Sequence, residues 1–117
     1  MQTDVWTLRE GVPTLTDEMV GFEVEGRDGT IGKVDHVSFA GTCVIISTSR
    51  FFGRKHVVPA GSVERIDPDD KKIFVDLATE DVENSPDYDD KLGFDDDCEA
   101  SVGDYYETVR GKQTAVT

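Results

Sequence analysis

The chain has 117 residues, of which 25 are acidic and 12 basic, so its formal net charge at pH 7 is −13. This length favours a single domain, and so large an acidic excess repels phosphate backbones, which argues against direct nucleic-acid binding as the main activity. No run approaches the ~18–20 apolar residues of a membrane helix and the N-terminus has no signal-peptide pattern, so we expect a cytoplasmic protein without a transmembrane segment.

The charge is unevenly spread along the chain. Residues 1–66 carry 9 acids and 7 bases, whereas residues 67–117 carry 16 acids and 5 bases. An adaptation for solubility would spread the excess evenly, so the asymmetry indicates an acidic appendage on a near-neutral body. We therefore expect an N-terminal arm over 1–14, a compact domain over 15–88, and an acidic extension over 89–117 that is partly ordered or disordered.

The first predicted element is a single helical turn over 16–21, with Thr16 as its N-cap and acids at its positive end. Residues 22–25 alternate apolar and acidic side chains, which predicts a half-buried strand with the acids facing outward. The dipeptide Asp28-Gly29 tolerates the positive φ of tight turns and predicts a β-hairpin.

Three of the next segments are expected to form strands. In the first, Ile31 to Phe39, the apolar residues cannot all face inward at period two, which predicts a β-bulge between Val34 and Val37. A second strand is expected over 43–48, and its continuous apolar run at 43–46 indicates burial on both faces. Residues 56–58 form the last of the three, and Pro59 at its end indicates an edge or exit of the sheet, because proline cannot donate to a strand ladder.

Two further short strands are expected over 63–66 and 73–77, separated by a strong turn at 67–70. Residues 79–83 predict a short helix that is N-capped by Thr79. Together these elements predict a mainly β fold: a small β-barrel of about six short strands with a short helix and an acidic C-terminal extension.

The extension is rich in acids but not purely polar. From Asp76 through Glu107 there are 13 acids and one base, interrupted by several aromatic residues. Solvated tails rarely keep that many aromatics, so we expect partial order, with the aromatics contacting the barrel or a partner. Residues 111–117 are expected to be disordered.

No motif indicates catalysis or a cofactor. Gly26, Gly29 and Gly32 have turn spacing rather than the spacing of a dinucleotide-binding loop. His36 and His56 lie on different predicted strands without further metal ligands at the required spacing. We therefore expect no enzyme, no catalytic, cofactor-binding or metal-binding residues, and no cofactor.

The remaining chemistry-bearing residues are acids and thiols. The acids of 87–99 do not follow the calcium-loop pattern, which leaves weak divalent-cation binding by the acidic extension open. Cys43 starts an apolar run and Cys98 lies among acids, so we expect both to be free thiols.

Several residue groups carry a family resemblance. They are, in chain order, Val20-Gly21, Asp28-Gly29, Ile31-Gly32-Lys33-Val34, Phe52-Gly53, Val57-Val58-Pro59, Val63 and Ile73-Phe74-Val75. Over about residues 15–88 the chain resembles the PRC-barrel family, whose members resemble the cytoplasmic domain of the reaction-centre H subunit and the C-terminal domain of the ribosome-maturation factor RimM. The resemblance implies a small domain that binds other proteins or assemblies, and it transfers no catalytic residue.

The candidate interaction residues are Phe51, Phe52, Arg54 and Lys55. Two adjacent aromatics in a loop point to different sides, so one can be exposed beside the basic pair; alternatively, both cover the barrel. The predicted function is a non-catalytic protein-interaction or assembly module that self-associates, as a homodimer, or binds another protein. The alternative is an accessory factor in ribosome maturation or RNA metabolism that acts through a protein contact.

Overall fold

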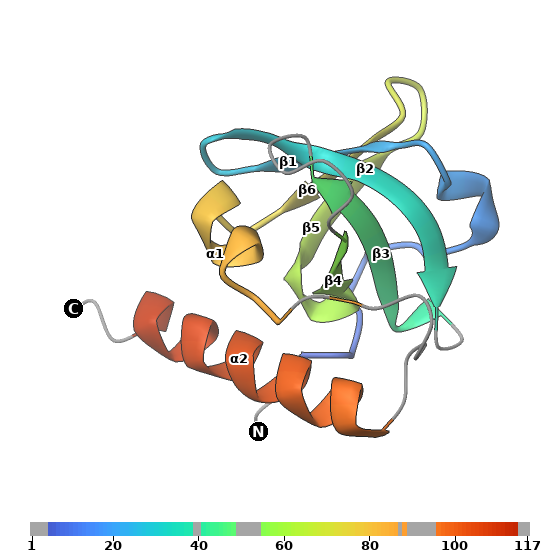
Figure 1. Cartoon of the computed structure of the whole chain (residues 1–117). Helices are drawn as coiled ribbons and strands as arrows, with labels where there is room; N and C mark the ends of the chain where they lie inside the picture. Colours follow the sequence, from blue (N-terminus) through green and yellow to red (C-terminus); the bar gives the residue numbers. More distant parts are fainter. Residues whose placement is uncertain (1–4, 39–40, 49–54, 87, 89–95, 115–117) are drawn as a thin grey trace.

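The computed structural model describes residues 5–38, 41–48, 55–86, 88 and 96–114. Their backbone forms strands followed by two α-helices, with one short 3-10 turn before the first strand and another between the fourth and fifth (Figure 1). In chain order the elements are η1 (Asp17–Met19), β1 (Glu23–Gly26), β2 (Gly29–Ser38), β3 (Cys43–Thr48), β4 (Lys55–Pro59), η3 (Ala60–Ser62), β5 (Val63–Asp67), β6 (Lys72–Val75), α1 (Thr79–Glu83) and α2 (Asp96–Thr114).

The strands form one six-stranded sheet in the order β4-β3-β2-β1-β6-β5. Neighbouring strands are antiparallel except β1 and β6, which pair in parallel. The sheet curls into a half-barrel (Figure 1), and η3 joins its two edge strands, β4 and β5, directly. The prediction of a mainly β fold with about six short strands and a short helix is confirmed.

Three local strand predictions are also confirmed. The register of β2 against β3 shifts between Val34 and His36, so the bulge lies in the expected interval and Asp35 is its extra residue. Residues 43–46 of β3 are fully buried without alternation, as a strand covered on both faces requires. Pro59 ends β4, an edge strand of the sheet.

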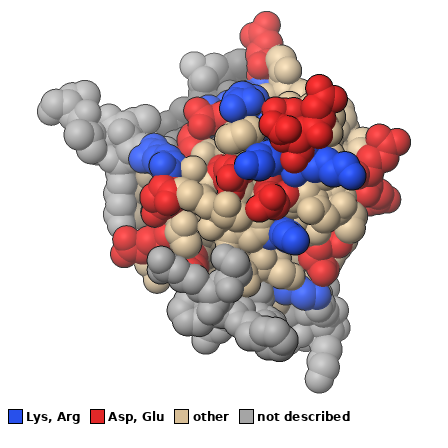
Figure 2. Space-filling view, turned by 90° about the horizontal axis from the view of Figure 1, so that it is seen from above, with Lys and Arg blue, Asp and Glu red and all other residues tan. Residues whose placement is uncertain are grey.

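The outer face of the sheet is lined with charges of both signs (Figure 2). Across four strands the register places Lys33 beside Glu23, Glu23 beside Lys72, and Lys72 beside Asp67. Opposite charges on neighbouring strands contribute roughly 0.2–1 kcal/mol per pair. This alternation of charges keeps the outer face of the sheet polar and locally balanced.

The short helix α1 is tied to the β1–β2 hairpin. Both the backbone N–H and the hydroxyl of Thr79 donate to Asp28 Oδ1, each at 2.9 Å. The Ala78 N–H donates to the Asp81 carboxylate at 3.0 Å. The prediction that Thr79 is the N-cap is therefore wrong: Ala78 occupies that position, and a carboxylate from a distant turn receives the hydrogen bonds of Thr79.

The helix α2 packs beside β4, below the sheet in the view of Figure 1. Its inward stripe contains Val102, Tyr106 and Val109, all buried, at the spacing of one helix face. The sequence analysis did not predict this helix, and the expectation of disorder is wrong for residues 111–114, which are its last turn. Residues 115–117 lie outside the described part of the chain.

The N-terminal arm packs against the turn between the two edge strands. Val5 is buried, and its carbonyl accepts the Gly61 N–H at 2.7 Å. Arg9 Nε donates to the Gly61 carbonyl at 3.0 Å, and the Arg9 guanidinium pairs with the Asp76 carboxylate. The expected division of the chain at residues 14 and 88 stays a prediction.

Candidate interaction surface

The free edge of β4 is covered by groups from the C-terminal part of the chain. The register pairs all five residues of β4 with β3, and the carbonyls of Lys55 and Val57 accept hydrogen bonds from outside the sheet. Lys55 O accepts the Tyr88 N–H at 2.9 Å, and Val57 O accepts the Tyr106 hydroxyl at 2.7 Å. Exposed strand edges invite pairing with other chains, so these two contacts protect this edge.

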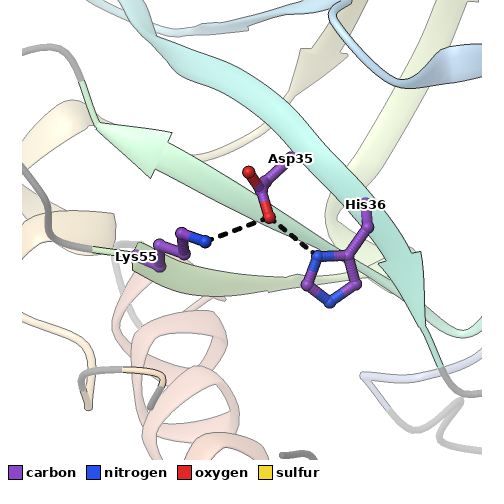
Figure 3. A network of polar contacts seen from close by, with 3 residues as sticks. All are labelled: Asp35, His36 and Lys55. Carbon is purple, nitrogen blue, oxygen red and sulfur yellow. Dashed lines mark hydrogen bonds and ion pairs between the residues drawn. The ribbon is translucent and has the colours of Figure 1, made fainter. Parts of the chain in front are cut away.

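Of the four candidate interaction residues, the structure describes Lys55, the first residue of β4. Phe51, Phe52 and Arg54 lie outside the described residues, so their role stays a prediction. Lys55 Nζ lies 3.2 Å from Asp35 Oδ2 on β2. The contact joins the two strands that flank β3 (Figure 3).

Asp35 reaches both a lysine and a histidine because it is the extra residue of the β2 bulge. Its Oδ2 lies 2.9 Å from His36 Nδ1 and 3.2 Å from Lys55 Nζ, and Figure 3 shows both of these side chains directed at the Asp35 carboxylate. A bulge increases local twist and redirects side chains out of the pleat. In a regular strand, Asp35 and His36 would point to opposite faces.

Tyr88 completes the cluster. Its ring meets the His36 imidazole edge-on, with centroids 5.9 Å apart and an interplanar angle of 63°, while its N–H is bonded to Lys55 O. The side chains of Asp35, His36 and Lys55 remain 35%, 38% and 24% exposed. We call Asp35, His36, Lys55 and Tyr88 the Asp35–Lys55 surface.

The hydrogen bond from His36 is the main reason why the pKa of Asp35 lies below its ordinary value of 3.8. Partial desolvation acts in the opposite direction, and the hydrogen bond and charge of Lys55 lower the pKa further. The carboxylate is thus ionised at neutral pH, between a cation and an imidazole. Sequence reasoning missed Asp35, His36 and Tyr88 as neighbours of Lys55, although the predicted bulge indicated where the pleat is broken.

We expect Asp35→Asn to lower the free energy of unfolding at neutral pH by less than about 1 kcal/mol, because the ion pair is partly exposed. Since the folded-state pKa is below 3.8, the stabilisation is complete above that pH and is lost as the pH falls through the folded value. Urea unfolding of both proteins at neutral and acidic pH measures the difference. An Asp35 carboxyl that titrates in NMR at or above its ordinary pKa would contradict this assignment.

The second histidine lies in a different environment. His56 is fully buried, and its Nδ1 lies 3.0 Å from Ser85 Oγ. The Ser85 hydroxyl donates to Val82 O at 2.6 Å, so its oxygen accepts from the His56 Nδ1–H. His56 thus links β4 to the end of α1, and the structure does not bring the two histidines together.

Among the residues that the structure describes, no three His, Cys, Asp or Glu side chains gather in a way that could hold a metal ion. Weak divalent-cation binding by the extension stays a prediction, because 89–95 lie outside those residues. Within the same described ranges, no helix is both long enough and apolar enough to cross a membrane. The cytoplasmic location also stays a prediction.

The architecture is that of a small mainly β protein with a helical C-terminal segment. No family model matches the chain, and no curated protein matches it. Among solved structures it is similar to a Pseudomonas aeruginosa protein described as a candidate 16S ribosomal RNA processing protein, RimM, with 20% identity and a TM-score of 0.43. The match covers 63% of this chain and 50% of that one, so the chain spans about half of that protein's length. At this level, the likeness carries no argument about function.

Proposed function

We propose that the chain is a non-catalytic protein-interaction module of the PRC-barrel type that self-associates through the Asp35–Lys55 surface. The observation that carries the proposal is the β2 bulge, which turns Asp35 toward Lys55 across β3. A partly exposed ion pair contributes little to stability. Its placement by a special backbone feature therefore supports a role in recognition.

The charges on this surface are complementary to a second copy of itself. In a two-fold interface the same patch meets itself, so Asp35 of one copy can face Lys55 of the other. The whole chain carries a net charge of −13, which opposes close approach of two copies. A patch where an acid and a base lie 3.2 Å apart is locally neutral and avoids that repulsion.

The surroundings of the surface support the same proposal. Tyr88 adds an aromatic ring beside His36, and the residues that precede β4 in the sequence include Phe51, Phe52 and Arg54. Aromatic residues and arginine are enriched at protein interfaces relative to other surface. The sequence next to Lys55 therefore has the residue types of an interaction site.

Sedimentation velocity over a wide concentration range tests the proposal. We expect the full chain to form a dimer and the charge reversal Lys55→Glu to weaken it at least tenfold, because two carboxylates then meet across the two-fold axis. The swap Asp35→Lys with Lys55→Asp restores opposite charges and should restore the dimer. Arg27→Glu makes the same charge change at the exposed β1–β2 turn and should leave the dimer intact.

If the wild-type chain is monomeric at all concentrations, the proposal of self-association is wrong. Affinity purification with wild type and Lys55→Glu then tests for another protein as the partner. Co-purification with ribosomal subunits that Lys55→Glu abolishes would support the alternative, an accessory role in ribosome maturation.

A further inference from the structure

The imidazole of His36 has one nitrogen engaged and one that can take up a proton. Its Nδ1 lies 2.9 Å from Asp35 Oδ2. The hydrogen bond from His36 is the main cause that holds the pKa of Asp35 below 3.8, so the carboxylate is ionised near neutral pH and can only accept hydrogen bonds. Nδ1 of the neutral imidazole therefore carries the proton, and Nε2 is the basic nitrogen.

This basic nitrogen belongs to a side chain at the surface. The His36 side chain is 38% exposed, and within the described part of the chain its Nε2 makes no hydrogen bond. Protonation at Nε2 leaves the Nδ1–H bond to Asp35 in place, so the charge of the ring can change while the fold stays as it is. Histidine is the side chain whose charge ordinarily changes between pH 5 and 8.

The charged groups beside His36 come from two strands. Asp35 lies on the same strand, and Lys55 of β4 lies 3.2 Å from Asp35 Oδ2. The neighbouring strand β3 meets His36 with Ile45 and has no acidic or basic residue, while Tyr88 supplies its ring. Two further elements pack against β2, and no hydrogen bond or ion pair joins their acids to His36; these acids are Asp17 and Glu18 of η1 and Glu80, Asp81 and Glu83 of α1.

We propose that protonation of His36 dissociates the dimer that forms through the Asp35–Lys55 surface, so that a fall in pH below neutrality separates the two copies. This inference rests on the proposed function, because it assigns a regulation to the same surface. With neutral His36 the charges of Asp35 and Lys55 cancel. With protonated His36 each copy presents a net positive charge at the place where the two copies meet.

The sign of the effect follows from the two-fold arrangement. At neutral His36, Asp35 of one copy can face Lys55 of the other. A protonated His36 forms a charge-assisted hydrogen bond with Asp35, which offsets the negative charge that Lys55 of the other copy would meet. Protonation also lowers the overall acidity of the chain slightly, but charges separated by more than about 8 Å are largely screened at physiological ionic strength. The contacts across the interface therefore determine the direction.

Sedimentation velocity of the full chain at about pH 7.5 and about pH 5.5, at one ionic strength, measures the dimer Kd on both sides of the histidine range. We expect the Kd of the wild type to be at least about tenfold higher at the lower pH, because protons then bind the monomer in preference to the dimer. NMR of the His36 ring over the same range should show it titrating where the Kd rises. Circular dichroism at both pH values establishes that the chain stays folded.

The matched variant is His36→Gln, whose amide can still donate to Asp35 but carries no titrating charge. We expect it to form the dimer with the same Kd at both pH values. The variant retains the buried His56, so a constant Kd also shows that the second histidine does not control the dimer.

The possible failures are distinguishable. A wild-type dimer with equal Kd at both pH values, or one that strengthens as the pH falls, would overturn the pH control and leave self-association standing. A pH dependence that persists in His36→Gln would assign the control to another group and would overturn it as well. A wild-type chain that is monomeric at both pH values contradicts the dimer itself, and the pH control with it.

Discussion

The Tyr106→Ala variant is expected to lose about 3–5 kcal/mol of unfolding free energy, as large aromatic-to-alanine truncations in cores do. Tyr106 is only 2% exposed and is among the largest fully buried side chains. Its ring packs edge-on against that of Tyr105, with centroids 5.1 Å apart, and its hydroxyl caps the β4 edge. Urea unfolding, followed by far-UV circular dichroism, gives the free energy.

The single tryptophan of the chain, Trp6, reports separately whether α2 detaches from the sheet. A Cβ added at Gly103 of α2 would lie 3.4 Å from the Trp6 indole nitrogen, so the indole packs against the helix. Trp6 fluorescence should shift to longer wavelength in Tyr106→Ala under native conditions. An unchanged emission spectrum combined with unchanged stability would contradict the packing described for α2.

The matched variant Tyr106→Phe isolates the hydroxyl. It keeps the ring but leaves the Val57 carbonyl without its donor, at a cost of about 1–3 kcal/mol. Tyr105→Phe is the control, because its hydroxyl donates to the Asp81 carbonyl from a partly exposed position and its loss should cost less.

Burial also raises the pKa of Tyr106, and that of Tyr105 to a smaller extent. The folded-state pKa is thus above the unfolded value of about 10, so the neutral phenol stabilises the fold fully below that pH. This stabilisation is lost as the pH rises through the folded value. We therefore expect the free energy of unfolding to fall as the pH rises above about 10, and to fall less steeply in Tyr106→Phe than in the wild type.

Overpacking typically costs about 1–3 kcal/mol. The Gly32→Ala variant is expected to lose unfolding free energy at the upper end of that range or beyond it. A Cβ at Gly32 would lie 2.1 Å from the Ser47 carbonyl oxygen and 2.9 Å from its carbon. These are backbone atoms of the paired strand β3 and cannot move aside without breaking the ladder. Thermal or urea unfolding measures the loss.

The control variant Gly103→Ala should raise the free energy of unfolding instead of lowering it. Gly103 lies inside α2, and its added Cβ would meet the Trp6 side chain at ordinary contact distances of 3.4–3.8 Å. Alanine is favoured over glycine in a helix by about 1 kcal/mol, so a gain of up to that amount is expected. Two glycine-to-alanine changes of equal effect would show that the contacts at β2 and β3 are wrong.

The sheet was predictable because its residues follow local rules. Alternation at 22–25 sets which side of β1 is buried, and the apolar run at 43–46 requires a central strand. The bulge in β2 could be located from the spacing of Val34 and Val37 alone. Pro59 indicated an edge strand because it lacks an N–H. Each of these signals lies within a few neighbouring residues.

The helix α2 could not be predicted in the same way. Its 19 residues include five acids and two glycines, Gly103 and Gly111, and glycine is a poor helix former. Its inward stripe is short, and the helix is stabilised by packing beside β4, where Tyr106 contacts Val57, 49 residues earlier in the chain. A helix that depends on tertiary contacts leaves a weak local pattern.

The Asp35–Lys55 surface was predictable only in part. Lys55 was selected from its position after an aromatic loop, whereas Asp35 and His36 were outside the predicted set. A bulge can be placed from spacing, but the direction in which its extra residue points depends on the partner strand. Tyr88 joins the cluster through a backbone hydrogen bond to Lys55 O, which no side-chain pattern encodes.

The two carbonyl caps on β4 impose an order of events during protein synthesis. The phenol that covers Val57 is encoded 49 residues later, so at about 5–20 residues per second it leaves the ribosome about 2–10 s after its acceptor. During that interval the β4 edge of the nascent sheet is uncovered, and nascent chains on neighbouring ribosomes of the same messenger RNA can pair with it. Faster translation of the acidic segment shortens the exposure, and codon choice there should control the yield of correctly folded protein.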